Sequence, residues 1–313
     1  MPPAFVHQIT KYDPADRDEH GRYRGGEEAI SDCGPVEAAY LEAISAFAEA
    51  AGIDRLEIRE PSVTGFVHFG AQPAVEGHGL GGIFPADLTG YHDGAEVSLE
   101  VALELIRVML REQGAWCRLE AGDVFAVHVG WDQYVYVGSD RPCADAVART
   151  RELGLFAEPL SASPYAAEPE VTEAADEDFW ATVRTELAAR QALLLEETPI
   201  LNATHWHRLT AENLNAVRTG LGPRALLTIW PDLQSDVGAV LTALPPEWHV
   251  EFVWEAKDGT IRATIVDETE YQELAALVAD ARAARALPFH ADEYNPLLQA
   301  ALPDSDGVLR ARW

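Results

Sequence analysis

The chain has 313 residues, 48% of them hydrophobic, which is enough to bury the cores of two globular domains. Its 52 acidic residues outnumber its 23 basic ones, and the formal net charge of -29 at pH 7 opposes long-range attraction to nucleic-acid phosphates. Charges interrupt every apolar run of membrane-spanning length, and the first residues lack the pattern of a secretion signal. The three cysteines are too widely spaced for a zinc motif or a disulfide ladder, so we expect a cytoplasmic protein.

The first segments alternate between strand-like and helix-like patterns. Phe5–Tyr12 alternates apolar and polar residues as a strand does, and Pro35–Ala51 repeats apolar residues with the period of a helix. Asp32 is a suitable N-cap for this helix, and Arg55–Arg59 has the pattern of a second strand. A strand, a helix and a strand in this order suggest that the two strands are adjacent and parallel.

Gly65–Val97 is rich in glycine and proline and shows no sustained period. It is therefore predicted to be a long loop, and a loop of this length inside a compact domain is usually functional. It contains His68, His78 and His92 together with several aspartates, which would suit an acid–base or metal cluster. An enzyme with its site in this Gly/His-rich loop is one hypothesis, and histidines that pack structurally are the alternative.

The clearest patterns follow this loop. Ser98–Gln113 is an amphipathic helix with Ser98 as its cap, and Ala115–Glu120 is a strand. Asp123–Asp140 holds two segments dense in β-branched and aromatic residues around a short loop, which predicts a β-hairpin. A helix is predicted next, at Arg141–Leu153.

Alternation gives the predicted hairpin two different faces. The aliphatic face is expected to pack on helices, and His128, Tyr134 and Tyr136 share the other face. That face is interpreted either as a second packed layer or as a platform on which RNA bases or nucleotides stack. Val135–Ser139 matches the first-strand motif of an RNA-recognition fold, but the partner motif does not occur downstream.

The second half begins after an acidic linker at residues 157–178, which is rich in proline, alanine and acid. The patterns beyond it predict helices at Phe179–Leu195 and Thr210–Thr219, a strand at Ala225–Trp230, a helix at Ser235–Leu244, a hairpin of Trp248–Ala256 with Thr260–Val266, and a helix at Thr269–Ala286. We therefore expect an α+β protein with two mixed α/β domains, residues 1–156 and 179–313. Each domain is expected to have a β-hairpin followed by a helix packed on a small sheet.

Two patterns carry candidate metal ligands. Asp16, Asp18 and Glu27 occupy positions 1, 3 and 12 of a calcium-loop template, although His20 replaces an oxygen ligand and a polar turn is the alternative interpretation. His205 and His207 would share a face on a strand but not on a helix, and no third ligand is evident. Calcium at residues 16–27 is the only cofactor that the sequence suggests.

Three stretches resemble a known family: Ile9–Tyr23 (ITKYDPADRDEHGRY), Ser31–Tyr40 (SDCGPVEAAY) and Gly130–Asp140. They are similar to uncharacterised bacterial cytoplasmic proteins that are common in actinobacteria and are sometimes labelled RNA-binding. Weaker similarity continues to Leu244. The family has no established activity, so the resemblance implies an RNA hypothesis and supplies no catalytic residues.

The charge, together with the lack of a recognisable catalytic motif, favours a non-catalytic acidic binding protein. Its partner would be a basic protein, which it would bind as an inhibitor, an immunity protein or a regulator. An RNA- or nucleotide-binding module that uses His128, Tyr134 and Tyr136 is the alternative. A chain that is acidic only for solubility or for adaptation to salt also fits the composition.

Overall fold

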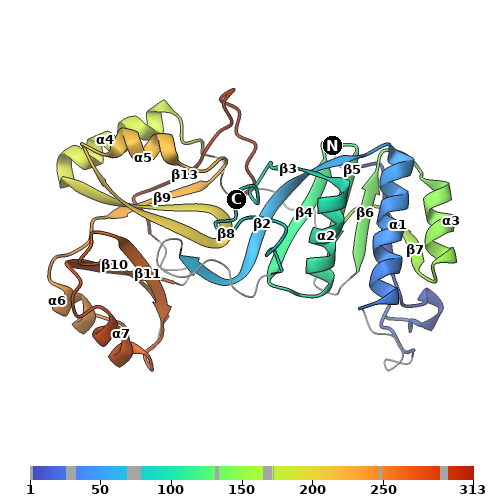
Figure 1. The fold of residues 1–313 in the computed structure, drawn as a ribbon, viewed down its shortest axis with the longest axis horizontal. Helices are drawn as coiled ribbons and strands as arrows, with labels where there is room; N and C mark the ends of the chain where they lie inside the picture. Colours follow the sequence, from blue (N-terminus) through green and yellow to red (C-terminus); the bar gives the residue numbers. More distant parts are fainter. Residues whose placement is uncertain are drawn as a thin grey trace. The chain divides into compact units, whose positions relative to one another are not determined.

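The computed structural model describes residues 3–25, 33–68, 79–130, 134–164, 171, 173–246, 249–289 and 295–313. The chain forms two compact units, one of Met1–Thr64 with Val75–Glu168 and one of Gly65–Ala74 with Pro169–Trp313. Both units combine helices with sheets, which confirms the predicted α+β class (Figure 1). Among the described residues, no helix is both long enough and apolar enough to cross a membrane.

The first unit contains an antiparallel sheet in the order β3-β2-β4-β5-β6-β1-β7. Its strands are β1 (Phe5–Thr10), β2 (Arg55–His68), β3 (Glu96–Ser98), β4 (Ala115–Ala121), β5 (Phe125–Val129), β6 (Val135–Ser139) and β7 (Phe156–Leu160). The expected parallel pairing of the first two strands is wrong, because β4, β5 and β6 lie between β2 and β1. The strand β7 also occupies the start of the predicted acidic linker, where it pairs with β1.

Three helices cover one face of this sheet: α1 (Pro35–Ala51), α2 (Leu99–Leu110) and α3 (Ala144–Glu152) (Figure 1). The aliphatic face of the β5–β6 hairpin is buried beneath them, with Val127 and Val137 paired and almost fully enclosed. Ser98 caps α2 as predicted, because its hydroxyl accepts a hydrogen bond from the Val101 amide. The residue at the N-cap of α1 is Gly34 rather than Asp32, since Pro35 already occupies the first turn.

A buried aspartate fixes the region that was expected to be an open loop. Asp93 is only 2% exposed, and one of its oxygens accepts hydrogen bonds of 3.0 Å from both Arg59 Nε and the Glu60 amide. Glu60 has a φ of 51° and lies where the pairing of β2 with β4 shifts register, which identifies a β-bulge. The hydroxyl of Tyr91, also fully buried, donates to the Trp116 carbonyl at 2.8 Å. The segment from residue 79 to β3 is therefore packed against β2 and β4.

The second unit has two sheets that pack face to face, each covered on its outer side by helices. One sheet, β13-β9-β8, packs on α4 and α5, and the other, β11-β10-β12, packs on α6 and α7 (Figure 1). The elements are α4 (Glu177–Arg190), β8 (Ala192–Thr210), α5 (Leu214–Gly220), β9 (Leu226–Pro231), α6 (Val237–Thr242), β10 (Val250–Glu255), β11 (Ile261–Val266), α7 (Tyr271–Leu277), β12 (Ala283–Pro288) and β13 (Leu298–Ala301). Leu194, Trp230 and Val253 belong to the apolar layer between the two sheets.

The β8 segment folds back on itself. Glu197 and His207 are ten positions apart in the chain, yet their side chains meet at 2.7 Å, a separation that one extended strand cannot produce. Asn202, with a φ of 68°, lies at the turn between them. Only the first arm, Leu193–Thr198, pairs with β9. We refer to Ala192–Thr210 as the β8 hairpin.

Two predicted helices of this half are wrong in extent. The helix expected at Phe179–Leu195 ends at Arg190, because Gln191 takes a φ of 74° and the following leucines alternate between the two faces of β8. The helix expected at Thr269–Ala286 is the short α7, and its last residues belong to β12, which pairs with β10. Sheet pairing overrides the helix propensity of this alanine-rich stretch. The hairpin of β10 and β11 is confirmed.

The buried Asp93 gives a test of how firmly this segment is held. Asp93→Ala leaves the enclosed Arg59 guanidinium without the Asp93 carboxylate and with its longer contact to Glu57, at 3.8 Å, and the expected loss of stability is about 3 kcal/mol. Hydrogen exchange of the β2 and β4 amides, measured peptide by peptide, should accelerate by about two orders of magnitude.

The matched control is Glu96→Ala. It removes the exposed ion pair between Glu96 of β3 and Arg55, which lies on β2 as Arg59 does. This change should cost less than about 1 kcal/mol. Equal acceleration by the two variants would contradict a structural role for Asp93.

Candidate functional site

The aromatic face predicted in the first unit is formed, but it is largely enclosed. His128 pairs with Tyr136 on β6, and Tyr136 is only 6% exposed. Burial, and then the nearby charge of Arg118, lower the pKa of His128 to about 4 although Glu120 acts in the opposite direction. A Cβ on Gly138 would come within 2.9 Å of the Pro3 ring, so Pro3 lies directly on this face of β6. These contacts favour a packed layer over a stacking platform.

Tyr134 lies at the end of this face in an aromatic group. Its ring centroid is 6.1 Å from that of Tyr12 in an edge arrangement, and the Tyr12 ring is 4.5 Å from the Tyr23 ring. All three side chains are partly accessible to solvent. The residues of the calcium-loop template are near Tyr12 and Tyr23 in the chain.

The candidate metal ligands are used by other interactions where they are described. Asp18 accepts hydrogen bonds of 2.9 Å from the amides of His20 and Arg22 and another from Arg24 Nε, and the Arg22 amide is the main cause of its lowered pKa. Asp16 ends a short 3-10 turn, and Glu27 lies outside the described residues. The Asp18 carboxylate therefore organises the turn itself.

The histidines of the Gly/His-rich loop do not form a described cluster. His92 Nδ1 donates to the carbonyl oxygen of Asp93 at 2.9 Å. His68 lies in β2 but its side chain is outside the described residues, as is the whole of His78. Within the described ranges, no group of three or more histidine, cysteine or acidic side chains is arranged to hold a metal ion.

A pocket of about 210 Å³ in the second unit has the strongest combination of shape and chemistry. It lies at the tip of the β8 hairpin, between the two sheets. Its polar lining is Glu196, Thr198, Asn202, Thr204 and Glu251, and its apolar lining is Leu201, Leu226, Ile265, Pro288 and Phe289. Apolar walls with a few convergent polar groups are typical of binding pockets. We refer to it as the acid-lined pocket.

The two carboxyl groups of this pocket come from opposite sheets. Glu196 lies on the first arm of the β8 hairpin and accepts a 3.0 Å hydrogen bond from the Trp230 indole. Burial, and to a smaller extent the negative charge of Glu196, raise the pKa of Glu251, on β10, to about 8. An interaction with the Trp206 indole acts in the opposite direction. The pair therefore shares one proton at neutral pH, which lets it bind a cation in place of the proton or donate the proton.

At the other end of the layer between the two sheets, an arginine lies between the carboxylates. Arg208 donates to Asp232 through two nitrogens, at 2.8 and 2.7 Å, and to Glu255 of β10 at 2.7 Å. Asp232 and Glu255 raise the pKa of Arg208, mainly through the Asp232 hydrogen bonds. Both carboxylates are thereby paired with a cation of the chain itself.

His205 and His207 share a face of the β8 hairpin, as expected for a strand, with nearly parallel rings 6.5 Å apart. His207 Nε2 donates to the buried Glu197, whose other oxygen accepts from the Gly222 amide at 2.6 Å. These bonds hold the pKa of Glu197 below its ordinary value, although burial alone would raise it. The arrangement joins the hairpin to the segment after α5.

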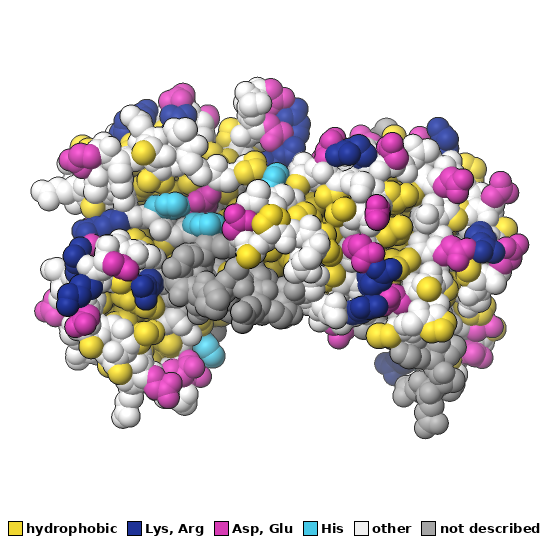
Figure 2. All heavy atoms as spheres, in the orientation of Figure 1, with side chains coloured by type: hydrophobic (Ala, Val, Ile, Leu, Met, Phe, Trp, Pro, Cys, Tyr) yellow, Lys and Arg dark blue, Asp and Glu magenta, His cyan; other side chains and the backbone are white. Residues whose placement is uncertain are grey.

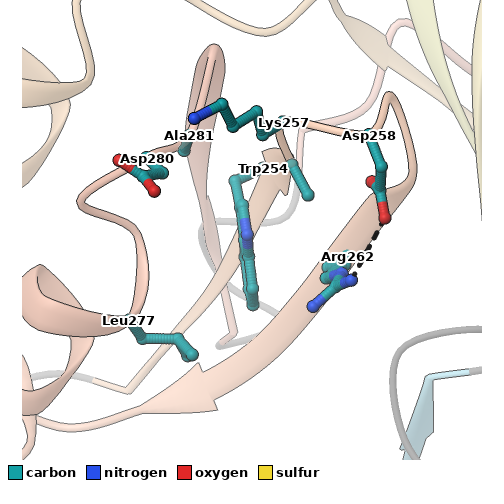
Figure 3. A pocket seen from close by; sticks show the side chains of 8 residues that line it. Trp254, Lys257, Asp258, Arg262, Leu277, Asp280 and Ala281 are labelled. Carbon is teal, nitrogen blue, oxygen red and sulfur yellow. Dashed lines mark hydrogen bonds and ion pairs between the residues drawn. The ribbon is translucent and has the colours of Figure 1, made fainter.

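A second pocket of about 270 Å³ lies beside β10, β11 and α7 (Figure 3). The indole of Trp254 forms its buried wall, and the guanidinium of Arg262 is paired with Asp258 at 3.5 Å. Lys257 and Asp280 at its rim are exposed. Its charges are already paired or solvated, so it has no group comparable to Glu251.

The sequence patterns did not indicate the acid-lined pocket. Glu196 follows a stretch that was expected to be helical, and Glu251 was placed in a hairpin without a functional role. The available signal was the alternation of Val250–Glu255, in which Glu251, Val253 and Glu255 share a strand face opposite three large apolar side chains. A strand with two buried faces and two acids on one of them requires a partner for each acid.

Comparison with protein-family models, with curated proteins and with solved structures gives no match.

The protonated Glu251 gives a pH prediction. In the unfolded chain its pKa is about 4.3, so between pH ~4.5 and ~8 the folded chain holds a proton that the unfolded chain has released. This contribution to stability is complete below pH ~4.5 and is lost as the pH rises through about 8. Glu251→Gln should remove this loss, so that the stability difference between pH ~5.5 and ~7.5 shrinks by about 2 kcal/mol.

Urea unfolding followed by tryptophan fluorescence is a suitable measurement, because Trp180, Trp206, Trp230 and Trp254 are buried in the second unit. The control is Glu255→Gln on the same strand, which replaces the carboxylate that accepts a hydrogen bond from Arg208 and should destabilise the unit equally at both pH values. A Glu251→Gln variant with the pH dependence of the unaltered protein would refute the assignment.

Proposed function

We propose that the protein is a non-catalytic acidic binding protein whose partner is a basic protein that it inhibits or regulates. The observation that carries this proposal is that most of its basic side chains are ion-paired within the chain. The chain has only two lysines, and most arginines of the described residues are in ion-pair contact with carboxylates of the same chain. They are Arg17, Arg24, Arg55, Arg59, Arg107, Arg111, Arg118, Arg141, Arg149, Arg184, Arg190, Arg208, Arg218, Arg224, Arg262, Arg282 and Arg310.

These ion pairs determine the electrostatic field that an approaching molecule experiences. Glu37, for example, is buried and binds both Arg107 and Arg111, and Arg107 also pairs with Glu104, so two carboxylates balance the two guanidinium charges. Figure 2 shows basic side chains lying beside acidic ones over much of the visible face. The excess carboxylates, which account for the net charge of -29, then set the outward field. Such a field attracts a basic surface and raises its association rate.

The same field opposes nucleic acid as the partner. Phosphate binding depends on unpaired lysine and arginine side chains, and the described arginines are mostly committed. The stacking platform that the RNA hypothesis requires is also largely enclosed, since Tyr136 and the Gly138 face are covered. The family resemblance with its RNA-binding label therefore receives no further support from the site.

The test is purification of a partner from the cells that produce the protein, followed by binding with the two purified components. We expect one basic protein in stoichiometric amounts, with an association rate constant that falls about tenfold between ~50 and ~500 mM salt while the dissociation rate changes little. Binding that is insensitive to salt, or the lack of a stoichiometric basic partner, would reject the proposal. Filter binding with a short single-stranded RNA is the counter-test, and tight binding that Tyr136→Ala abolishes would support the RNA alternative instead.

A further inference from the structure

The acid-lined pocket has the size of a single side chain. Its volume of about 210 Å³ is below the range of roughly 300–1,000 Å³ that holds drug-sized ligands. Its wall contains Leu226, Ile265 and Pro288, and the two most exposed apolar side chains at it are Leu201, 52% exposed, and Phe289, 38% exposed. A short aliphatic stem would be in contact with this wall along its length.

The polar end of the pocket is suited to a positive charge. Glu196 and Glu251 approach from opposite sheets, and they disfavour each other's ionised form. A cation placed between them would convert this repulsion into two attractions and would take the place of the shared proton. Thr198, Thr204 and Asn202 supply further oxygens at the same pocket.

A buried indole beside Glu251 supports the same assignment. Trp206 is 8% exposed, and its Nε1 is enclosed with no hydrogen-bond partner at bonding geometry among the described residues. The indole faces Glu251, where it lowers the pKa of that residue. A buried donor of this kind indicates a site that is completed by a ligand or a water molecule, since enclosed polar atoms are almost always satisfied.

The chain already contains one cation that lies between two carboxylates, as a ligand in the pocket would. At the other end of the same layer, Arg208 lies between Asp232 of one sheet and Glu255 of the other and bonds to both at 2.7 Å. A cation at the acid-lined pocket would occupy the corresponding position between Glu196 and Glu251.

We propose that the acid-lined pocket receives a lysine or arginine side chain of the basic partner, with its cationic head between Glu196 and Glu251 and its stem against the apolar wall. This inference rests on the proposed function for the identity of the partner. The chemistry it requires is a primary ammonium or guanidinium group on a short apolar stem, and this can be tested without the partner.

The first experiment is calorimetric titration at pH 7 with n-butylammonium, n-butylguanidinium and the isosteric neutral n-butanol. We expect the two cations to bind with Kd values on the order of 1 mM and the alcohol to bind about tenfold more weakly. Cation binding should release protons, so its apparent enthalpy should differ between buffers of different ionisation enthalpy. Equal binding of the alcohol, or cation binding without proton release, would overturn the proposal.

Three variants distinguish binding in the pocket from a nonspecific effect of the negative charge of the protein. Glu196→Gln and Glu251→Gln should each weaken butylammonium binding about tenfold, and Glu251→Gln should abolish the proton release. Glu268→Gln removes the same charge from an exposed position of the same unit and should change the Kd less than about twofold. Equal weakening by all three variants would show a nonspecific field effect. Urea unfolding of each variant confirms that it is folded.

The second experiment uses the purified partner and keeps the two proposals distinguishable. If the pocket receives a side chain, Glu196→Gln and Glu251→Gln weaken partner binding about tenfold, mainly through faster dissociation, and Glu268→Gln does not. A partner that binds all variants equally would refute the pocket and leave the proposed function intact. Butylammonium binding without any basic protein partner would refute the proposed function and leave the cation site, with a small amine as its ligand.

Discussion

Two sheets that pack face to face have to neutralise every charge that they enclose, and this constraint organises the second unit. The centre of the layer satisfies it with apolar side chains such as Leu194, Trp230 and Val253. One end satisfies it with Arg208, which neutralises a carboxylate from each side. The other end satisfies it with a proton on Glu251 and with the Trp230 indole, which donates to Glu196. A single layer therefore contains an internally completed ion pair and a site whose charge depends on what enters it.

The same distinction extends to the whole chain. Arginine dominates the cations of this protein, and its planar fork is suited to holding two carboxylate oxygens at once. Arg224 with Asp304 and Arg111 with Glu37 are bidentate pairs of this kind, formed between segments far apart in the chain. The arginines consequently pair with carboxylates of the same chain and link distant segments. The carboxylates that remain unmatched in number give the exterior its negative charge. A stable interior and a strongly negative exterior follow from one use of arginine.

The sequence was sufficient wherever one local pattern decided the structure. The period of α1, the cap of α2 and the alternation of the two hairpins are local, and these elements were predicted. Residues 283–286 were assigned to a helix because alanine favours helices, yet they pair with β10, a contact that local propensity does not encode. The acid-lined pocket was missed for the same reason, since Glu196 and Glu251 meet only when the two sheets stack. The turn at Asn202 carried no strong signal either, so the β8 hairpin was not anticipated.

Glu196 and Glu197 are neighbours in the chain with opposite electrostatic environments. Glu197 is ionised beside His207 and the Gly222 amide, whereas Glu196 lies across the layer from the protonated Glu251. Since successive side chains of a strand point to opposite faces, a slip of one residue against β9 would exchange them. The exchange would separate Glu197 from the Gly222 amide and place Glu196 on the α4 side. The two glutamates thus favour one register of β8 against β9. The leucines on both faces of the strand would tolerate a shift, and the charged residues would not.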